Sequence, residues 1–320
     1  MARIYGRPDS ELDIVSDAPD SVEKFEDIDI EHQKLKDGLA QDKKKFFDNV
    51  PNAISKEEQK LVKMKNDEQI TEQEFNEKLR LLEKKKAEGG LTRVSSSFKG
   101  YFVKNYSKRR AINKIKDKQV EQESTIKNWK ENPTGIFNDW KHETISDIEE
   151  FDELKEDPMY AGAKGEVEVL KKLSELSNDF HVLCGVSKDL GKYITYRGRR
   201  NLRSAQMDFV VVSKRGVILI EVKNWSNYFV KHHRGLSPHA QVERAGMVLW
   251  ISLKSSWRSP RNPKVTSVLL SVQNNMQFSD NYRFVNVKNL NNINTYIQNR
   301  YEIFSDAEVE RLVGRLGGRH

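Results

Sequence analysis

Cysteine is almost absent from this sequence, since Cys184 is the only one among 320 residues. A lone cysteine excludes an intramolecular disulfide and a cysteine-rich zinc site. The sequence also lacks an apolar run of membrane-spanning length, and its first residues turn acidic without the apolar segment of a secretory signal. We therefore expect a protein of a reducing compartment, the cytoplasm, with no membrane partner.

Charge is plentiful but unevenly distributed, and the net charge of +7 hides this. Residues 158–320 carry 25 Lys and Arg against 13 Asp and Glu, or +12, whereas residues 1–157 carry 30 against 35, or −5. A basic domain suits a polyanionic partner such as nucleic acid, because Lys and Arg neutralise phosphates. Basic domains are common, so charge alone does not identify the partner.

The length and the composition divide the chain into four parts. Residues 1–52 are rich in Asp and Glu without a sustained period, which predicts an acidic, flexible arm. Residues 53–132 have helical patterns of the coiled-coil type, and residues 133–157 predict an acidic linker. Residues 158–320 alternate between helical and strand patterns and predict a separate α/β domain.

Two short helices are predicted at the start of the helical part. A capping box at Ser55 begins the first helix, residues 66–69 interrupt it, and a second capping box at Thr71 begins a helix that ends at Gly89. The resulting hairpin resembles the small SHOCT-type helix-turn-helix modules. That resemblance implies a role in oligomerisation or in recruiting a partner protein.

Residues 98–130 predict a longer helix in which aromatic residues and lysines interleave. One interpretation is a surface for nucleic acid or for a partner, with rings that stack on bases. The other is an amphipathic helix whose aromatic stripe packs against its neighbours, and we favour it because stripes at helical spacing usually belong to a core. The aromatic residues concerned are Phe98, Tyr101, Phe102 and Tyr106.

The order of elements in residues 158–320 predicts a mixed β-sheet flanked by helices, joined to an all-α N-terminal region. Apolar residues recur at helical spacing after Tyr160, and residues 238–254 form a second predicted helix that begins at a proline. Two further helices are expected at the end of the chain. The predicted strands cover residues 180–186, a shorter stretch near Tyr193, the apolar runs 209–212 and 217–220, and residues 265–272, and the closing helices cover residues 289–300 and 305–316.

The stretch QMDFVVVSKRGVILIEVKNW, from Gln206 to Trp225, has the pattern of a tight β-hairpin. If Val212 pairs with Val217, Asp208 falls opposite Glu221, with their Cβ atoms about 5 Å apart. The period of two then places Lys223 on the same face as Glu221. A three-residue loop with a left-handed glycine would shift the register by one and separate the two acids.

Two further segments carry candidate site residues. Glu166 lies at helical spacing from the apolar residues of its helix, so we expect it on the buried side, although a carboxylate placed there by the helix dipole is the alternative. The loop after residue 196 and the stretch VKHHRG offer cations that grip phosphates, although such charge runs are often solvated turns. The cations proposed to bind nucleic acid are Arg197, Arg199, Arg200, Arg203, Lys231 and Arg234.

These motifs together carry a family resemblance. The segments GAKGEVEVL, QMDFVVVSKRGVILIEVKNW and PHAQ resemble the nuclease-related domain, NERD, of the PD-(D/E)xK restriction-endonuclease-like superfamily, over roughly residues 160–316. Met207 precedes the acid where the superfamily pattern has proline, and Phe209 follows it where NERD sequences often have histidine. Neither departure removes a predicted metal ligand.

The resemblance implies a metal-dependent phosphodiesterase. Its signature residues are Glu166, Asp208, Glu221 and Lys223, with Gln241 of the Pro-x-x-Gln element beside them. Mg²⁺ or Mn²⁺ would be held by Asp208 and Glu221, with the Val222 carbonyl and Glu166 completing the shell. Lys223 would orient the attacking water or stabilise the charge of the transition state.

Three functions remain open at this point. The first is a nuclease that cuts nucleic acid, DNA before RNA, with the helical part serving oligomerisation or regulation in defence against foreign DNA. The second is a non-catalytic scaffold that binds nucleic acid and recruits partners. The third is an oligomeric regulator whose N-terminal half restrains the nuclease. An intact set of acids and lysine favours the first, because a binder of DNA gains nothing from opposed carboxylates facing phosphate.

Overall fold

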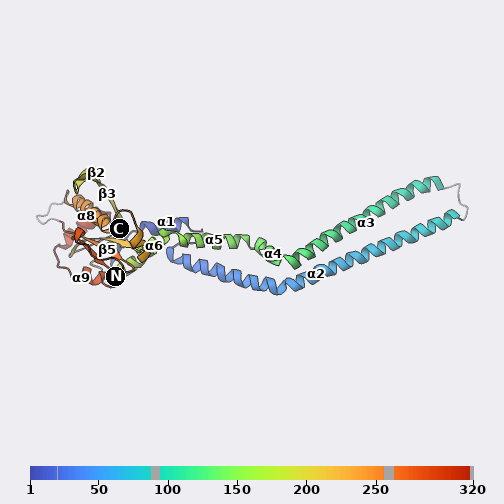
Figure 1. Cartoon of the computed structure of the whole chain (residues 1–320), viewed down its shortest axis with the longest axis horizontal. Helices are drawn as coiled ribbons and strands as arrows, with labels where there is room; N and C mark the ends of the chain where they lie inside the picture. The colour runs from blue at the N-terminus through green and yellow to red at the C-terminus, as the bar shows by residue number, and fades with distance from the viewer. Residues whose placement is uncertain (20, 88–93, 256–262, 318–320) are drawn as a thin grey trace. The chain divides into compact units, whose positions relative to one another are not determined.

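The computed structural model describes residues 1–19, 21–87, 94–255 and 263–317, without the side chains of residues 82, 85–87, 94–107, 199 and 200. The chain divides into two compact units (Figure 1). One unit combines Met1–Glu31 with Glu149–His320, and the other is His32–Ile148. Within the described residues, no helix combines the length and apolar character needed to cross a membrane.

Six strands in the described part of the first unit form one mixed sheet, in the order β1-β2-β3-β4-β5-β6. β1 is parallel to β2. β3 is antiparallel to both of its neighbours, β2 and β4. β4, β5 and β6 are parallel to one another. The sequence prediction of a mixed sheet with flanking helices is therefore confirmed. The strands span Arg3–Tyr5, His181–Tyr196, Arg199–Ser213, Gly216–Lys223, Val265–Ser271 and Val285–Lys288.

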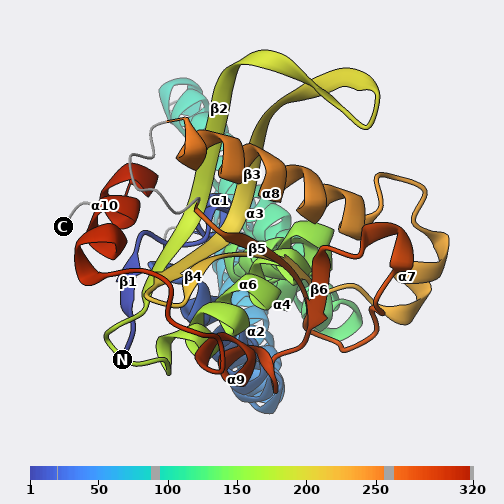
Figure 2. The ribbon, with the colours of Figure 1, turned by 90° about the vertical axis from the view of Figure 1, so that its left-hand side faces the viewer.

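Both faces of the central strand β4 are covered, which explains its continuous apolar sequence. Val217 and Leu219 point to one face and pack with helices α8 and α10, whereas Ile218 and Ile220 point to the other and pack with α6 and α9. Figure 2 shows α8 and α9 on opposite sides of the sheet. These helices span Pro158–Ser174 (α6), Pro238–Lys254 (α8), Ile293–Gln298 (α9) and Asp306–Leu316 (α10).

The predicted helices of this unit agree with the structure at α8 and α10. Ser305 caps α10 and forms the predicted capping box with Glu308. The helix predicted over 289–300 is shorter, because residues 289–292 form an asparagine-rich turn with side chains bonded to backbone N–H groups. Three short elements after residue 158 were not predicted, namely β6, the helix α7, Asn227–His232, and a 3₁₀ turn at Asp280–Tyr282.

The N-terminal segment differs most from its prediction, because residues 1–31 belong to the unit that holds the sheet. β1 adds an edge strand beside β2, and α1, Asp9–Asp17, packs against α6. Val22, Phe25 and Ile28 are buried at a spacing of three residues. The expected flexible arm over residues 1–52 is thus replaced by ordered elements, since four of its apolar residues, Ile14, Val22, Phe25 and Ile28, are buried.

A glycine in β2 allows this segment to approach. Gly185 has a left-handed φ of +60°, and a Cβ placed on it would lie 2.4 Å from Asp9 Oδ1. We expect Gly185→Ala to lower the free energy of unfolding by about 1 kcal/mol more than Gly191→Ala, because Asp9 must leave its hydrogen bond with Gln206. Gly191 is the matched control, with a φ of +72° and no atom within 4 Å of its added Cβ.

Denaturant unfolding of the two glycine variants measures this difference. Equal losses of stability would contradict the close packing of α1 on the sheet.

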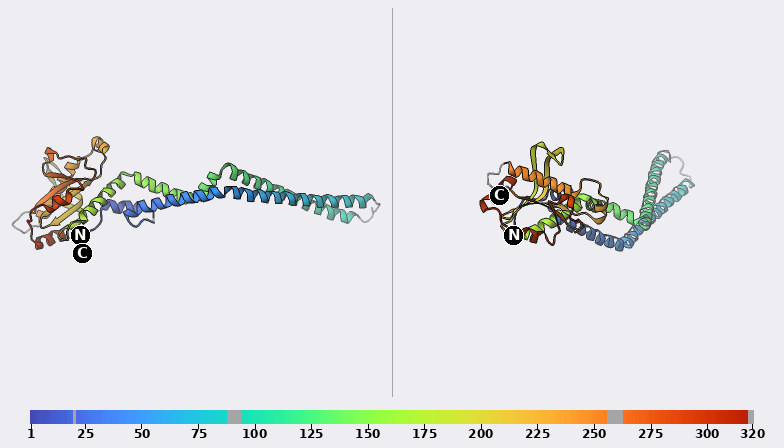
Figure 3. Two further views of the ribbon diagram at one scale, coloured as in Figure 1. Left: turned by 90° about the horizontal axis from the view of Figure 1, so that it is seen from below. Right: turned by 60° about the vertical axis from the view of Figure 1, so that its left-hand side comes forward.

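The second unit is a helical hairpin, but its helices differ from those predicted. α2, Phe25–Ala87, runs without interruption through residues 66–69, and its partner is α3, Val94–Glu131 (Figure 3). The predicted break is wrong because four polar residues without glycine or proline are compatible with a helix, and Glu68 among them pairs with α3. The side chains of Phe98, Tyr101, Phe102 and Tyr106 lie outside the described residues.

Ion pairs fix the direction of α3 relative to α2. Lys130 Nζ lies 2.7 Å from Glu58, and Lys116 Nζ lies 3.2 Å from Glu68, so later residues of α2 meet earlier residues of α3. Phe46 stacks on Trp129 at the base of the hairpin. The acidic linker expected over residues 133–157 is instead helical, as α4, Pro133–Trp140, and α5, His142–Glu156.

Candidate functional site

The β3–β4 hairpin has the register expected from its sequence. Val212 pairs with Val217, and Phe209 pairs with Ile220. The loop consists of two residues, because Ser213 pairs with Gly216. Gly216 has a φ of +122°, so the glycine supplies the left-handed residue without adding a third loop position. The alternative register that separates the acids is thereby excluded.

Asp208 directly precedes Phe209, which pairs with Ile220, and it points at the end of β4. Its Oδ2 accepts a hydrogen bond of 2.7 Å from the backbone N–H of Val222. Burial raises the pKa of Asp208 well above its ordinary value, and the charges of Glu221 and Glu166 raise it further. The Val222 hydrogen bond opposes that shift and fixes the orientation of the carboxylate.

Glu221 is the most deeply buried acid of the site, with 2 % of its surface exposed. Its Oε1 accepts hydrogen bonds from Lys223 Nζ at 3.0 Å and from Gln241 Nε2 at 2.5 Å. Its Oε2 is buried and has no hydrogen-bond partner among the described residues. Burial raises the pKa of Glu221, and the Lys223 ammonium lowers it in part.

Glu166 reaches the same place from α6, because that helix packs closely on the end of β4. A Cβ on Gly165 would lie 2.6 Å from the Cβ of Asn224, so only glycine permits the contact. Asn224 Nδ2 also donates to the Ala161 carbonyl at 2.8 Å. These contacts hold the first turns of α6 beside Lys223.

Burial raises the pKa of Glu166 to about 7. The Ser10 hydroxyl and the charge of Lys223 oppose this shift, whereas the charge of Glu221 adds to it. The structure therefore gathers all five signature residues proposed from the sequence, with Glu166 linked to the others by charge rather than by direct contact. Their catalytic roles remain predictions.

The chemistry of these residues fits a hard divalent cation. Carboxylate oxygens are the ligands that Mg²⁺ and Mn²⁺ prefer, and Glu221 Oε2 is a buried acceptor that no described group satisfies. The Val222 N–H points toward Asp208, so its carbonyl, on the same side of the extended strand, faces that way too. Among the described residues, no group of three or more His, Cys, Asp or Glu side chains is arranged so that it could hold a metal ion, so the ligands from this chain are fewer than three in the present geometry.

The N-terminal segment also contributes to the site, which the sequence did not reveal. Asp9 Oδ2 accepts a hydrogen bond from Gln206 Nε2 at 2.5 Å, and its charge raises the pKa of Glu166. Burial, with nearby acids, raises the pKa of the Cys184 thiol to about 12, so this cysteine is no nucleophile. The sequence signal for α1 is the pair of acids Asp9 and Glu11, which suit the first turn of a helix.

The proposed phosphate-binding cations fall into three groups. Arg197 lies 2.6 Å from Glu243, and Arg203 lies 3.2 Å from Asp189, so internal carboxylates already neutralise both. The side chains of Arg199 and Arg200 lie outside the described residues. Lys231 in α7 and Arg234 just after it are exposed.

The raised pKa values predict how the stability of the metal-free protein depends on pH. The folded state keeps protons on Glu166, Asp208 and Glu221 that the unfolded state has released above pH 4.5. The stabilisation present at low pH is therefore lost as the pH rises through about 7. We expect the Tm in EDTA to fall between pH 5.5 and pH 8, and divalent cations to restore it more at pH 8.

Thermal unfolding of the wild type and of Asp208→Asn at both pH values separates this effect from other titrations. The variant lacks one of the repelling carboxylates, so its Tm should fall less as the pH rises. An equal fall in both proteins would contradict the coupling of the three acids.

Comparison with known proteins supports the sequence resemblance. Residues 161–271, about one third of the chain, match the model of the nuclease-related domain, NERD. The match confirms the predicted family resemblance and its C-terminal location, and it contains all five gathered residues. Searches of curated proteins and of solved structures gave no match.

Proposed function

We propose that the nuclease-related domain is a metal-dependent nuclease that hydrolyses phosphodiester bonds of nucleic acid, with DNA as its main substrate. The observation that supports this function is the convergence of three carboxylates and a lysine at the end of the β3–β4 hairpin. The net charge of +12 over residues 158–320 favours a polyanionic substrate around these acids.

Lys223 has the most direct chemical role in this proposal. Its ammonium is held 3.0 Å from Glu221 at the site, where it stabilises the negative charge that develops on the phosphate. Gln241 donates to the same Glu221 oxygen and so leaves Oε2 free to bind a cation. When bound, Mg²⁺ or Mn²⁺ supplies polarisation of the phosphate and lowers the pKa of a water molecule beside it.

Asp208 and Glu166 act in different ways because their surroundings differ. The Val222 N–H holds the Asp208 carboxylate in one orientation, so this acid serves as a fixed cation ligand. Glu166 has a pKa of about 7, so it can accept or release a proton at its carboxyl near neutral pH, or complete the cation shell once ionised.

The helix α7 supplies a surface on which nucleic acid can lie. It begins four residues after Lys223, and its Tyr228 is 72 % exposed. Trp225 and Phe229 pack edge to face at 4.8 Å and support the helix. With Lys231 and Arg234 exposed nearby, this element offers both a ring for stacking and cations for phosphate. The helical unit His32–Ile148 would serve oligomerisation or regulation.

The experiment incubates the pure full-length protein with plasmid, linear and single-stranded DNA and with RNA, in Mg²⁺, Mn²⁺ or EDTA. We expect cleavage with either metal and none in EDTA. Binding without cleavage on every substrate would overturn the proposal in favour of the non-catalytic scaffold.

A further inference from the structure

A basic pocket lies at the opposite end of β4 from the gathered acids. It has a volume of about 640 Å³, within the usual range for small-ligand sites. Arg215 lines it from the β3–β4 turn, while Lys223 ends β4, so roughly 25 Å of strand separates the two places. Its other main lining residues are Lys264, Lys288, Tyr296, Arg300 and Tyr301.

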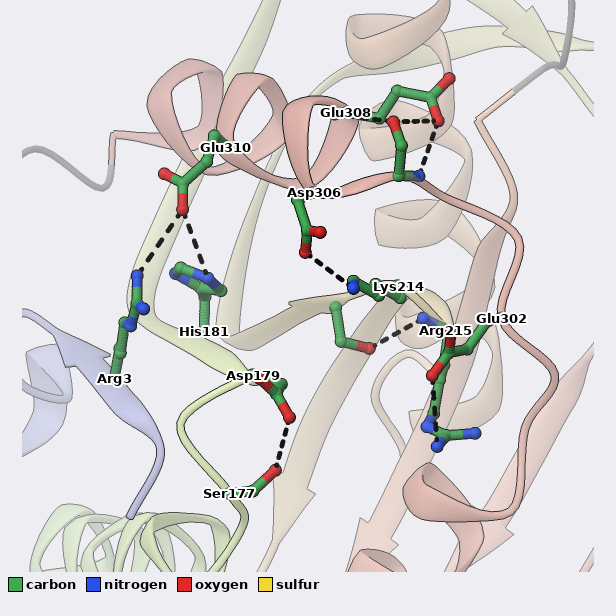
Figure 4. Close-up of polar contacts among 12 residues, drawn as sticks. Arg3, Ser177, Asp179, His181, Lys214, Arg215, Glu302, Asp306, Glu308 and Glu310 are labelled. Carbon is green, nitrogen blue, oxygen red and sulfur yellow. Dashed lines mark hydrogen bonds and ion pairs between the residues drawn. The ribbon is translucent and has the colours of Figure 1, made fainter.

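Four of the lining residues are cations, and none is an acid. The acids nearest the turn are already engaged, since Glu302 lies 3.6 Å from Arg215 and Asp306 lies 2.9 Å from Lys214 (Figure 4). No carboxylate in the described part of the chain forms an ion pair with Lys264, Lys288 or Arg300. The pocket therefore has an excess of positive charge that a bound anion would balance.

Arg300 is held in place before any ligand arrives. Its Nη2 donates to Thr266 Oγ1 at 2.7 Å, and its Nη1 donates to Tyr296 Oη at 3.1 Å. Its Nε is buried and has no hydrogen-bond partner among the described residues. Lys288 Nζ lies 4.4 Å from the centre of the Tyr296 ring. The two hydrogen bonds fix the orientation of the guanidinium at the pocket wall, where its charge attracts an oxyanion.

We propose that this pocket binds the phosphate group of a nucleotide. Phosphate matches the geometry of a guanidinium with two lysines beside it. Tyr301, 91 % exposed, lies at the pocket and offers a face on which a base can stack. The nucleotide is either free or the phosphorylated end of a nucleic acid. The inference does not depend on the proposed nuclease activity, because the two places share no residue.

Isothermal titration of the full-length protein in EDTA with AMP, and with a short oligonucleotide with or without a 5′ phosphate, tests the proposal. The main variant is the double change Lys264→Gln with Lys288→Gln, since Lys264 is exposed and Lys288 makes no ion pair with any residue that the structure describes. We expect it to raise the Kd at least about tenfold. Lys63→Gln, an exposed lysine of the helical unit, is the matched control and should keep the wild-type Kd.

The ligands distinguish the two sources of phosphate. Binding of AMP that the double variant weakens indicates a free nucleotide, and binding of the 5′-phosphorylated oligonucleotide alone indicates a nucleic-acid end. Both results support the pocket. Absence of binding by all three ligands, or equal affinity in wild type and double variant, would overturn it. Wild-type affinity in Arg300→Lys, which lacks the guanidinium, would also overturn the proposal.

Discussion

Asp208→Asn is expected to lower the rate of metal-dependent DNA cleavage by about a thousandfold, which corresponds to about 4 kcal/mol of transition-state stabilisation. The change removes one of the two carboxylates best placed to hold the cation. The asparagine oxygen can still accept the hydrogen bond from the Val222 N–H, so the end of the hairpin should keep its structure. The lower cleavage rate therefore measures the contribution of the Asp208 charge.

Initial cleavage rates at saturating Mg²⁺, measured beside thermal unfolding of the same preparation, check this prediction. Asp280→Asn is the matched control, because Asp280 is an exposed acid of the same unit, and it should keep wild-type activity. Wild-type cleavage by Asp208→Asn would show that the cutting site lies elsewhere.

Lys223→Met should lower cleavage by about a hundredfold or more and should also destabilise the protein by about 3 kcal/mol near pH 8. Methionine keeps most of the apolar stem but removes the cation that Glu221 faces at 3.0 Å. Glu221 is then a buried charge that keeps only its hydrogen bond from Gln241 and has lost its cation. The destabilisation should be smaller at pH 5, because the raised pKa of Glu221 lets it take up a proton there.

A double variant, Lys223→Met with Glu221→Gln, separates stability from catalysis. It leaves no unpaired charge, so it should recover most of the lost free energy of unfolding while cleavage stays low. Denaturant unfolding and cleavage rates of the two single variants and the double variant form the required cycle. If the double variant is as unstable as Lys223→Met, the pairing of Glu221 with Lys223 is not what stabilises this end of β4.

The sheet and most of its helices could be predicted because strong local patterns coincide there with global packing. The continuous apolar run of β4 reflects burial on both faces, and the helix α8 has a proline start followed by apolar residues at helical spacing. The register of the hairpin followed from one assumed pair, Val212 with Val217, and the side-chain period of two.

The elements that were missed depend on distant parts of the chain. β1 has only three residues and forms because it pairs with the edge of β2. No local sequence pattern predicts this pairing. α1 likewise gains its stability from α6. The helix break expected at residues 66–69 was wrong, because it was predicted from four consecutive polar residues. Only glycine and proline strongly oppose a helix, and neither occurs there.

The candidate site shows the same division. Asp208, Glu221 and Lys223 could be placed together because they lie within one hairpin. The Asp9 contribution, from nearly two hundred residues upstream, required the fold. The arginine loop was overvalued, because the sequence gives no sign that Glu243 and Asp189 pair with Arg197 and Arg203. Local sequence patterns do not reveal ion pairs between distant residues. Such pairs decide whether an arginine or lysine side chain can still bind phosphate.

The most direct test of the nuclease proposal is the initial rate of DNA cleavage by the wild-type protein as Mn²⁺ is titrated from an EDTA-treated, metal-free state at pH 8. The acid cluster predicts no cleavage at the start, a saturable rise with Mn²⁺, and no rise in Asp208→Asn measured in parallel. A rate that is already maximal in EDTA, or that rises equally in Asp208→Asn, would contradict the assignment of metal-dependent hydrolysis to the end of the β3–β4 hairpin.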